Sequence, residues 1–138
     1  VAQLIPNAEL LIVTTPQAAA AEVAERAGSI SVQTNQKVAG VIENMSAMVM
    51  PDGSTMDVFG TGGGEKVARR LSNITGDDVE VIGSVPLDPA LRIGGDVGNP
   101  IAISEPSSPT AAAINAIADK LATRKVSIVG KTLGLGVK

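Results

Sequence analysis

The sequence of 138 residues contains no cysteine, histidine, tryptophan or tyrosine, and Phe59 is its only aromatic residue. The lack of cysteine excludes disulfides, thiolate metal sites and cysteine nucleophiles. The lack of histidine excludes imidazole metal sites and both Ser-His and Cys-His catalysis. Any metal ion would have to meet carboxylates, which favour hard cations such as magnesium. The core must be built from valine, isoleucine and leucine, with alanine faces that allow close helix packing.

The charge pattern argues against a nucleic-acid-binding protein. The net charge is −3 and the pI is about 4.8, whereas nucleic-acid-binding domains gather lysine and arginine on one face. The positive charges are scattered except for Lys66, Arg69 and Arg70, which we interpret as the solvated side of a predicted helix. No apolar run is long enough to span a bilayer, and no signal segment is evident. We therefore expect a cytoplasmic location, with no membrane and no nucleic acid as partner.

Three apolar runs predict the strands of a parallel sheet. They cover residues 9–14, 38–43 and 79–85, and each is followed by turn residues. Continuous apolar strands of this kind are typical of parallel sheets that are covered on both faces. Between the second and third runs, residues 51–54 carry strong turn chemistry. Their flanks, residues 47–50 and 55–59, predict a protruding hairpin.

Helices are predicted between and after the strands. The first covers residues 17–27, with Thr15 as its cap, Pro16 in its first turn and Gly28 at its end. The last opens at Ser108 and Pro109. The intervening features are a weaker helical stretch within residues 30–37, a helix at 65–73, and a short helix with a glycine-rich loop up to residue 98. The apolar stripes are predicted at Val67, Leu71 and Ile74, and at Ile114, Ile117, Ala118 and Leu121.

The order of these elements predicts an α/β fold with right-handed crossovers. Three strands are few for a domain of this kind, and such apolar strands are poorly suited to the open edges of a sheet. The first residues also look like the end of a helix. We therefore expect a fragment, the C-terminal half of a parallel-sheet nucleotide-binding domain. Residues 1–124 would form this part of the domain, and residues 125–138 would form a loosely ordered tail.

Three glycine-rich segments partly resemble phosphate-binding loops. Gly130, Lys131 and Thr132 match the end of a G-x-x-x-x-G-K-[ST] loop, but Lys125 stands where its first glycine belongs. Residues 60–64 precede a helix, but Glu65 replaces the third glycine of a dinucleotide fingerprint. We interpret these segments as an ordinary tail and a flexible joint, and residues 94–96 as a loop. No catalytic residue and no metal ligand is assigned in this chain.

Ligands of open α/β sheets bind outside the carboxyl ends of the strands, and polar residues follow the predicted strands there. Asn44 can present a carboxamide, with both donor and acceptor, to a base such as adenine. Pro86, Leu87 and Asp88 can supply an apolar wall and backbone groups on the same side. The residues alone leave a plainer alternative open, in which Asn44 and Asp88 stabilise their own turns.

Four segments occur in order with the spacing of a known family. They are Leu-Ile-Val-Thr-Thr-Pro-Gln at 11–17, Gly-Val-Ile-Glu-Asn-Met-Ser at 40–46, Phe-Gly-Thr-Gly-Gly-Gly-Glu at 59–65 and Ile-Gly-Ser-Val-Pro-Leu-Asp at 82–88. Together they resemble the C-terminal half of Mrp/ApbC-type P-loop ATPases, iron–sulfur cluster carriers of the MinD and nitrogenase iron-protein group. The resemblance covers nearly the whole chain.

The resemblance implies an ATP site with a phosphate loop, switch segments and magnesium, none of which can be assigned to residues here. It implies that Asn44, Pro86, Leu87 and Asp88 border the adenine pocket. It also implies a homodimer whose partners are apo iron–sulfur proteins or assembly factors. One departure concerns the C-x-x-C pair that many members use to share a cluster between subunits. Its positions correspond to Met50 and Gly53, so we expect no iron–sulfur cluster to be held in the usual way.

Three hypotheses about function follow. The first is the C-terminal part of an ATP-hydrolysing iron–sulfur cluster carrier, inactive alone because the phosphate loop is missing. The second is a partitioning ATPase like MinD or ParA, although the last predicted helix has mixed charge and not the basic amphipathic character of a membrane anchor. The third is a non-enzymatic interaction module that works as the isolated 138 residues.

Overall fold

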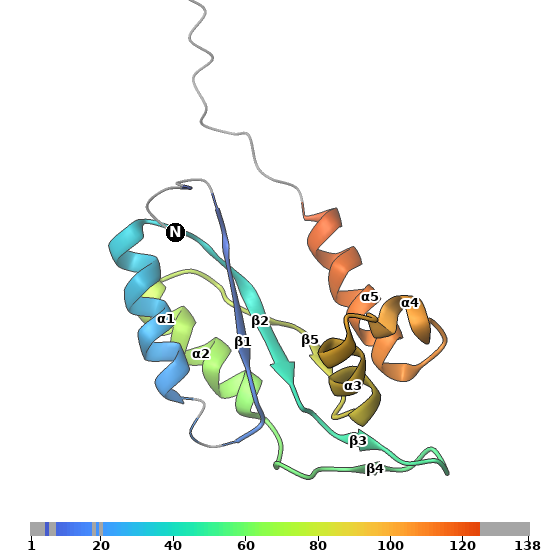
Figure 1. Cartoon of the computed structure of the whole chain (residues 1–138). Helices are drawn as coiled ribbons and strands as arrows, with labels where there is room; N and C mark the ends of the chain where they lie inside the picture. Colours follow the sequence, from blue (N-terminus) through green and yellow to red (C-terminus); the bar gives the residue numbers. More distant parts are fainter. Residues whose placement is uncertain (1–4, 6–7, 18, 20, 125–138) are drawn as a thin grey trace, which may run out of the picture.

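The protein has a three-layer α/β fold, seen in a computed structural model that describes residues 5, 8–17, 19 and 21–124. The central sheet has three parallel strands in the order β1-β2-β5, which cover Leu10–Thr14, Val38–Asn44 and Val81–Val85. Helices α1 (Ala21–Thr34) and α2 (Gly63–Thr75) lie over one face, and α5 (Pro109–Thr123) lies over the other (Figure 1). The predicted fold class and its three parallel strands are confirmed. The predicted tail at residues 125–138 lies outside the described part of the chain.

The main core lies between the sheet and the pair α1 and α2. Val41 of β2 and both Val67 and Leu71 of α2 are fully buried. Burying an aliphatic side chain of this size contributes about 1.5–3 kcal/mol. The buried members of this cluster are Ile12, Ala24, Val38, Val41, Val67, Ala68, Leu71 and Val79. The predicted stripe of α2 thus faces the sheet, although Ile74 at its end is 37% exposed.

The predicted end of the first helix at Gly28 is wrong, because α1 continues to Thr34. Gly28 lies in the helix interior, where α1 meets α2. A Cβ atom at Gly28 would lie 2.8 Å from Cγ2 of Ile74. The glycine therefore serves close packing and not termination, and the weaker stretch predicted within residues 30–37 is the end of the same helix. The start also differs: α1 begins at Ala21, so Thr15 and Pro16 precede the helix and Thr15 does not cap it.

The predicted loop at residues 94–96 is also wrong, because Gly94 and Gly95 lie within helix α3 (Pro89–Val97). Strong caps outweigh the poor helix propensity of glycine here. The Asp88 side chain accepts a hydrogen bond from the Ala90 amide at 2.8 Å, which satisfies one of the free donors at the helix start. At the other end, Gly98 adopts a left-handed conformation. The short helix α4 (Ile101–Ser104) follows.

The last helix, α5, begins as predicted. The Ser108 hydroxyl accepts a hydrogen bond from the Ala111 amide at 3.1 Å, and Pro109 occupies the first turn. Of the predicted stripe, Ile117 is buried whereas Ala118 is exposed. Ala118 was assigned wrongly because α5 faces the sheet along a narrow strip centred on Ile117, which fills the space beside Gly83 of β5. Within the described residues, no helix is long and apolar enough to cross a membrane.

The predicted hairpin is present and projects from the body of the molecule (Figure 1). Its strands β3 (Met48–Val49) and β4 (Thr55–Met56) are antiparallel and shorter than the predicted arms. The turn between them is held by Asp52, whose carboxylate accepts hydrogen bonds from the Ser54 amide and hydroxyl. These bonds hold the pKa of Asp52 below its usual value of 3.8.

Candidate functional site

The carboxyl ends of the three strands meet at one edge of the sheet. Thr14 of β1 lies beside Glu43 of β2, and Asn44 of β2 lies beside Val85 of β5. The segment after β5 is tied to the segment after β2, because the Ser46 amide and hydroxyl both donate to the Val85 carbonyl, at 3.1 and 3.0 Å. The polar residues that follow the strands are therefore neighbours in space, as the parallel arrangement predicts.

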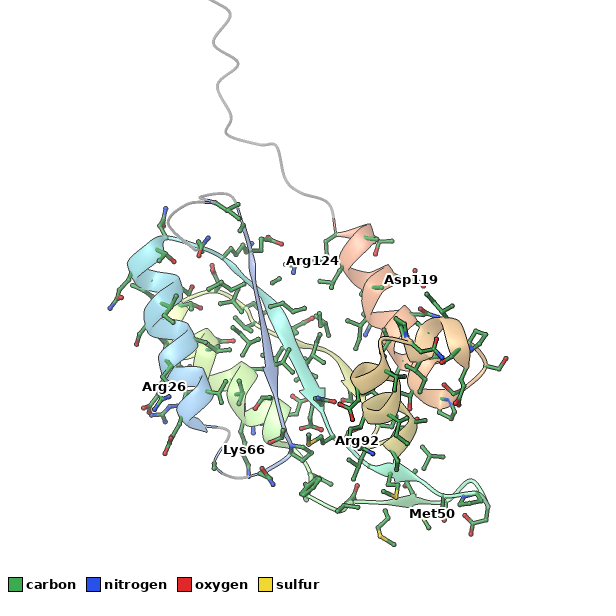
Figure 2. All side chains as sticks on the ribbon, viewed as in Figure 1. Arg26, Met50, Lys66, Arg92, Asp119 and Arg124 are labelled. Carbon is green, nitrogen blue, oxygen red and sulfur yellow. The ribbon has the colours of Figure 1, made fainter. Side chains whose placement is uncertain are left out.

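A cavity of about 430 Å³ opens at this edge. All four residues predicted to border the adenine pocket line it: Asn44, Pro86, Leu87 and Asp88. The sequence did not indicate the rest of the wall, which comes from the hairpin root and from α3: Met45, Met48, Pro89, Leu91 and Arg92. Figure 2 labels Arg92 on α3 and Met50 farther out on the hairpin. The wall is largely apolar, as is usual for pockets that bind small molecules.

The oxygen of the Asn44 side-chain amide already accepts a hydrogen bond, whereas the nitrogen does not take part in one with any described residue. Its Oδ1 accepts a hydrogen bond from the Met45 amide at 2.9 Å, and Met45 has a left-handed backbone with φ 55°. This is the local turn that the plainer alternative proposed for Asn44. Its Nδ2 makes no hydrogen bond with any described residue, so its two donors are available to a ligand. Turn formation and ligand contact are thus compatible roles for one side chain.

Asp88 is held in place from two sides. One carboxylate oxygen caps α3 through Ala90, and the other accepts a hydrogen bond from the Thr110 hydroxyl at 2.6 Å. Thr110 is 2% exposed and belongs to the first turn of α5. The carboxylate therefore connects two helices, and it fixes the backbone of Pro86 and Leu87 at the cavity. The Leu87 amide donates to the Ala47 carbonyl at 3.4 Å.

A second cavity of about 300 Å³ lies on the other side of Asn44, against the end of β1. Thr14, Thr15 and Gln17 contribute its polar groups. The Thr14 hydroxyl is buried and has no hydrogen-bond partner among the described residues. Asn44 therefore stands between an apolar cavity and a more polar one, a relation that the sequence did not indicate.

The glycine segment at residues 60–64 is not an open phosphate loop. The Gly64 amide at the start of α2 donates to the Glu43 carboxylate at 2.6 Å, so a side chain of β2 occupies the position where an anion would bind. A Cβ atom at Gly63 would lie 2.2 Å from the Thr15 carbonyl oxygen. These glycines let α2 start directly against the backbone after β1, which is a tighter role than the flexible joint expected from the sequence.

Met50 and Gly53, which correspond to the family's cysteine positions, lie on the hairpin. The Met50 amide donates to the Ser54 carbonyl at 2.8 Å, and Gly53 has φ 84°. Neither offers a thiolate. In the described part of the chain, no group of three or more acidic residues is close enough to hold a metal ion, and the sequence contains no cysteine or histidine.

Comparison with solved structures identifies the class of the fold. A nucleotide-binding protein from Archaeoglobus fulgidus, solved in complex with ADP, is 33% identical with a TM-score of 0.52 over 64% of this chain and 35% of that protein. The cell division ATPase MinD of Pyrococcus furiosus has a TM-score of 0.59 and 19% identity over 83% of this chain and 42% of its own. The second likeness shows the fold alone. The fold is that of P-loop NTPases.

The particular family follows from the sequence comparison. The model of the ParA group described as NUBPL iron-transfer P-loop NTPase matches residues 1–122. An iron–sulfur cluster carrier protein of Mycobacterium tuberculosis is 59% identical over 135 residues, which cover 98% of this chain and 35% of the relative. One from Synechocystis is 42% identical over 122 residues, 87% of this chain and 33% of the relative. The chain belongs to the iron-transfer P-loop NTPase family, and it spans about a third of the length of these relatives.

Proposed function

We propose that this chain forms the adenine side of the ATP site in an iron–sulfur cluster carrier, as the C-terminal part of its P-loop domain. The observation that carries the proposal is the cavity of about 430 Å³ at the strand ends, which has Asn44 at one side and Pro86 and Leu87 along its wall. Its position agrees with the general placement of ligands in open α/β sheets. The ADP complex of the Archaeoglobus fulgidus relative supports a nucleotide as the ligand.

The chemistry of Asn44 favours adenine over guanine. Its free Nδ2 can donate to a ring nitrogen, and the second lone pair of Oδ1 can accept from the exocyclic amino group of adenine. Guanine carries an oxygen acceptor where adenine carries this amino group. An acceptor opposite Oδ1 leaves a buried group unpaired, which costs about 1–3 kcal/mol. The proposed pocket should therefore discriminate between ATP and GTP.

The phosphate chemistry has to come from another part of the protein. Magnesium and a phosphate loop stabilise the charge during phosphoryl transfer to water. Within the described residues the most loop-like segment, at residues 60–64, already binds the Glu43 carboxylate. The exposed apolar side chains of the edge strand β1 support further protein beside it: Leu11 is 37% exposed and Val13 is 54% exposed. This chain would supply base recognition and leave hydrolysis to the segment that carries the loop.

The cluster is the cargo in this proposal, and the hairpin cannot ligate it as cysteine-bearing relatives would. Met50 and Gly53 provide no thiolate, and iron–sulfur clusters are held by cysteine thiolates. Any cluster would need ligands from other sequence or from the receiving apoprotein. We further propose that the protein acts as a homodimer in the cytoplasm and delivers to apo iron–sulfur proteins or assembly factors.

A hybrid protein tests base recognition. This chain replaces the 135-residue matching segment of the Mycobacterium tuberculosis carrier, to which it is 59% identical. We expect the hybrid to bind ATP at least about tenfold more tightly than GTP, as one lost hydrogen bond implies. Asn44→Ala should reduce this preference to about twofold or less. Asn115→Ala, a matched change on the exposed side of α5, should leave it unchanged.

Two outcomes would contradict the assignment. One is ATP binding whose preference over GTP survives Asn44→Ala. The other is nucleotide binding by the hybrid with no preference at all, which would place the base elsewhere.

A further inference from the structure

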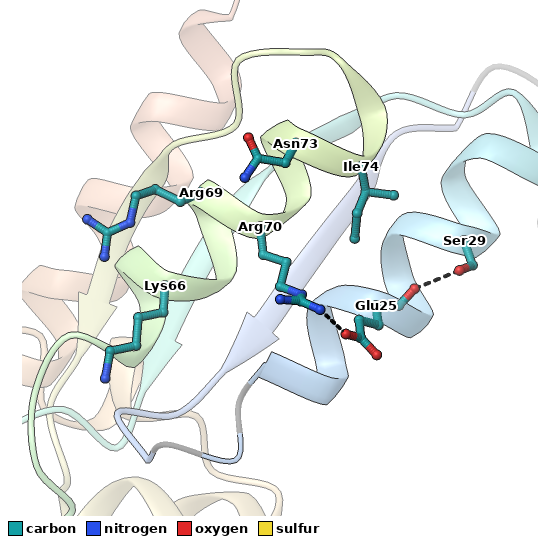
Figure 3. Close-up of a pocket in the computed structure, with 7 residues that line it drawn as sticks. All are labelled: Glu25, Ser29, Lys66, Arg69, Arg70, Asn73 and Ile74. Carbon is teal, nitrogen blue, oxygen red and sulfur yellow. Dashed lines mark hydrogen bonds and ion pairs between the residues drawn. The ribbon is translucent and has the colours of Figure 1, made fainter.

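A groove of about 750 Å³ lies between α1 and α2, on the solvent side of the helix pair (Figure 3). Lys66, Arg69 and Arg70 of α2 line it, together with Glu25 of α1. Ile74, which is 37% exposed, adds an apolar surface at one end. The groove is thus a concave surface with three cations, one carboxylate and an apolar contact.

Two of the three cations have no partner among the residues that the structure describes. Arg70 forms an ion pair with Glu25 across the groove, and both side chains are about half exposed, at 54% and 55%. Lys66 and Arg69 make no ion pair and no side-chain hydrogen bond with any described residue. An exposed pair such as Arg70 with Glu25 is worth about 0–1 kcal/mol. An incoming carboxylate can therefore exchange with Glu25 at little cost.

These cations do not stabilise the helix that carries them. Lys66 lies in the first turn of α2, where the helix dipole disfavours positive charge, whereas Arg69 and Arg70 lie near the middle of the helix, where the dipole has little effect. The last turn of α2, where cations would be favourable, contains none. Lys66 and Arg70 are also four residues apart, a spacing at which like charges repel. A local arrangement that opposes helix stability is typical of a surface retained for binding.

We propose that this groove binds a short acidic segment of a partner protein. Guanidinium groups engage carboxylates through two parallel hydrogen bonds, so Arg69 and Arg70 suit neighbouring acidic side chains, and Lys66 suits a third. Ile74 provides the contact for one apolar residue in that segment. The positive area is short because Glu22 flanks it on α1 and Glu65 flanks it on α2. A nucleic acid would need a longer positive stripe and aromatic residues for stacking, and the groove has neither.

The groove and the proposed adenine pocket lie on separate elements. The groove uses the outer sides of α1 and α2, whereas the pocket uses the strand ends, the hairpin root and α3. The two proposals can therefore fail independently. Variants in the groove should leave nucleotide affinity unchanged, and Asn44→Ala should leave binding at the groove unchanged.

Fluorescence anisotropy with the full chain tests the groove. The probe is a fluorescein-labelled peptide Glu-Glu-Leu-Glu-Glu-Leu-Gly, and its control replaces each glutamate with glutamine. We expect Lys66→Glu and Arg69→Glu each to weaken binding of the acidic peptide by about tenfold or more, since each reverses a charge-assisted contact. Lys37→Glu makes the same charge change outside the groove, and it should weaken binding by less than about twofold.

The binding should also weaken as salt rises from about 50 to about 300 mM, because the contacts are partly exposed. Circular dichroism of each variant checks that the fold is intact. The proposal is overturned if the acidic and glutamine peptides bind alike, or if Lys37→Glu weakens binding as much as Lys66→Glu. It is also overturned if the acidic peptide does not bind, or if single-stranded DNA binds the groove more tightly than the peptide.

Discussion

The two faces of the sheet are held by different means. On the face of α1 and α2, a continuous apolar cluster is buried, and Gly28 lets the helices approach closely. On the face of α5, Ile117 packs on Gly83, while two long cations reach the backbone of the sheet. Lys120 donates to the Ile82 carbonyl at 2.7 Å, and Arg124 donates to the Ala39 carbonyl. One face carries the larger apolar cluster, and the other combines a smaller set of buried apolar residues, Ile101, Ala111 and Ile117, with these polar links.

The candidate site lies on the polar-linked side. Helix α3 has no buried residue, and its apolar side chains Ile93 and Val97 are 51% and 71% exposed. In the neighbouring helix α4, Ile103 is 76% exposed. The residues that line the cavity of about 430 Å³ are positioned mainly by caps and turns. Binding residues are often carried by such segments on a rigid scaffold. The comparison predicts that substitutions on the packed face reduce stability most, and that substitutions near the site have smaller and more local effects.

The largest effect is expected from Gly63→Ala at the start of α2. The new methyl group would meet the Thr15 carbonyl and the Pro16 backbone, neither of which can rotate away. We expect a loss of about 3 kcal/mol in the free energy of unfolding, measured by urea denaturation. Gly95→Ala is the control, because the space beside Gly95 is open and the residue is helical. It should stabilise the chain by about 0.5–1 kcal/mol, and a similar loss for both variants would contradict the packing argument.

On the polar-linked side, Thr110→Val removes the hydrogen bond to Asp88 and keeps the shape of the side chain. We expect a loss of about 1–1.5 kcal/mol in unfolding free energy, because the Asp88 carboxylate loses the hydrogen bond from the buried Thr110 hydroxyl. Nucleotide affinity in the hybrid should fall as well, since Asp88 fixes the wall of the cavity. Thr123→Val, at an exposed position of the same helix, should change stability by less than about 0.5 kcal/mol. Equal effects of the two variants would show that the Asp88 link is unimportant.

Glu43→Gln tests the contact between the site edge and the packed face. The change keeps an acceptor for the Gly64 amide but removes the charge at the start of α2. We expect a loss of about 1 kcal/mol in unfolding free energy. Glu65→Gln, in the first turn of the same helix but without this hydrogen bond, should cost about 0.3–0.5 kcal/mol. If Glu65→Gln reduced the unfolding free energy more than Glu43→Gln, the hydrogen bond to Gly64 would not be the source of the stabilisation by Glu43, and the helix dipole alone would account for it.

The smallest effect is expected in the hairpin turn, where the pKa of Asp52 is lowered by the hydrogen bonds from Ser54. A lowered pKa means that the stabilising contribution is present at pH values above the unfolded pKa and is lost as the pH falls through the folded one. The Ser54 amide chemical shift should therefore titrate with a midpoint below 3.8. Asp52→Asn should abolish the titration. A midpoint at or above 3.8 would contradict the observed turn geometry.

The strands could be predicted because a continuous apolar run indicates a strand that is buried on both faces of the sheet. The parallel arrangement of the strands then brings Asn44 and Pro86 to the same edge. The helix errors at Gly28 and Gly94 have a common cause. Glycine disfavours a helix locally, and each of these two glycines is required by packing against a group that lies farther along the sequence. These groups are the side chain of Ile74 and the carbonyl of Asn99, which leave no space for a Cβ atom.

The site was predictable only in part for the same reason. The rule for strand ends indicates Asn44 and the residues after β5, since both follow directly from the topology. The part of the cavity wall that includes Arg92 belongs to α3, for which the sequence predicts only a short helix followed by a loop. The contact of Glu43 with Gly64 joins residues 21 positions apart, and no local pattern marks it. Contacts of this kind become visible only when the packing of α2 on the sheet is known.

The most direct test of the adenine pocket uses the four methionines as reporters. Met45 and Met48 line the cavity, whereas Met56 lies on the hairpin outside it. In the hybrid with the Mycobacterium tuberculosis carrier, labelled with ¹³C at the methionine methyl groups, addition of ADP should shift the Met45 and Met48 signals and leave the Met56 signal in place. Asn44→Ala should weaken this response, and GDP should produce less of it. Shifts confined to Met56, or none at millimolar ADP, would contradict the proposed role of this site.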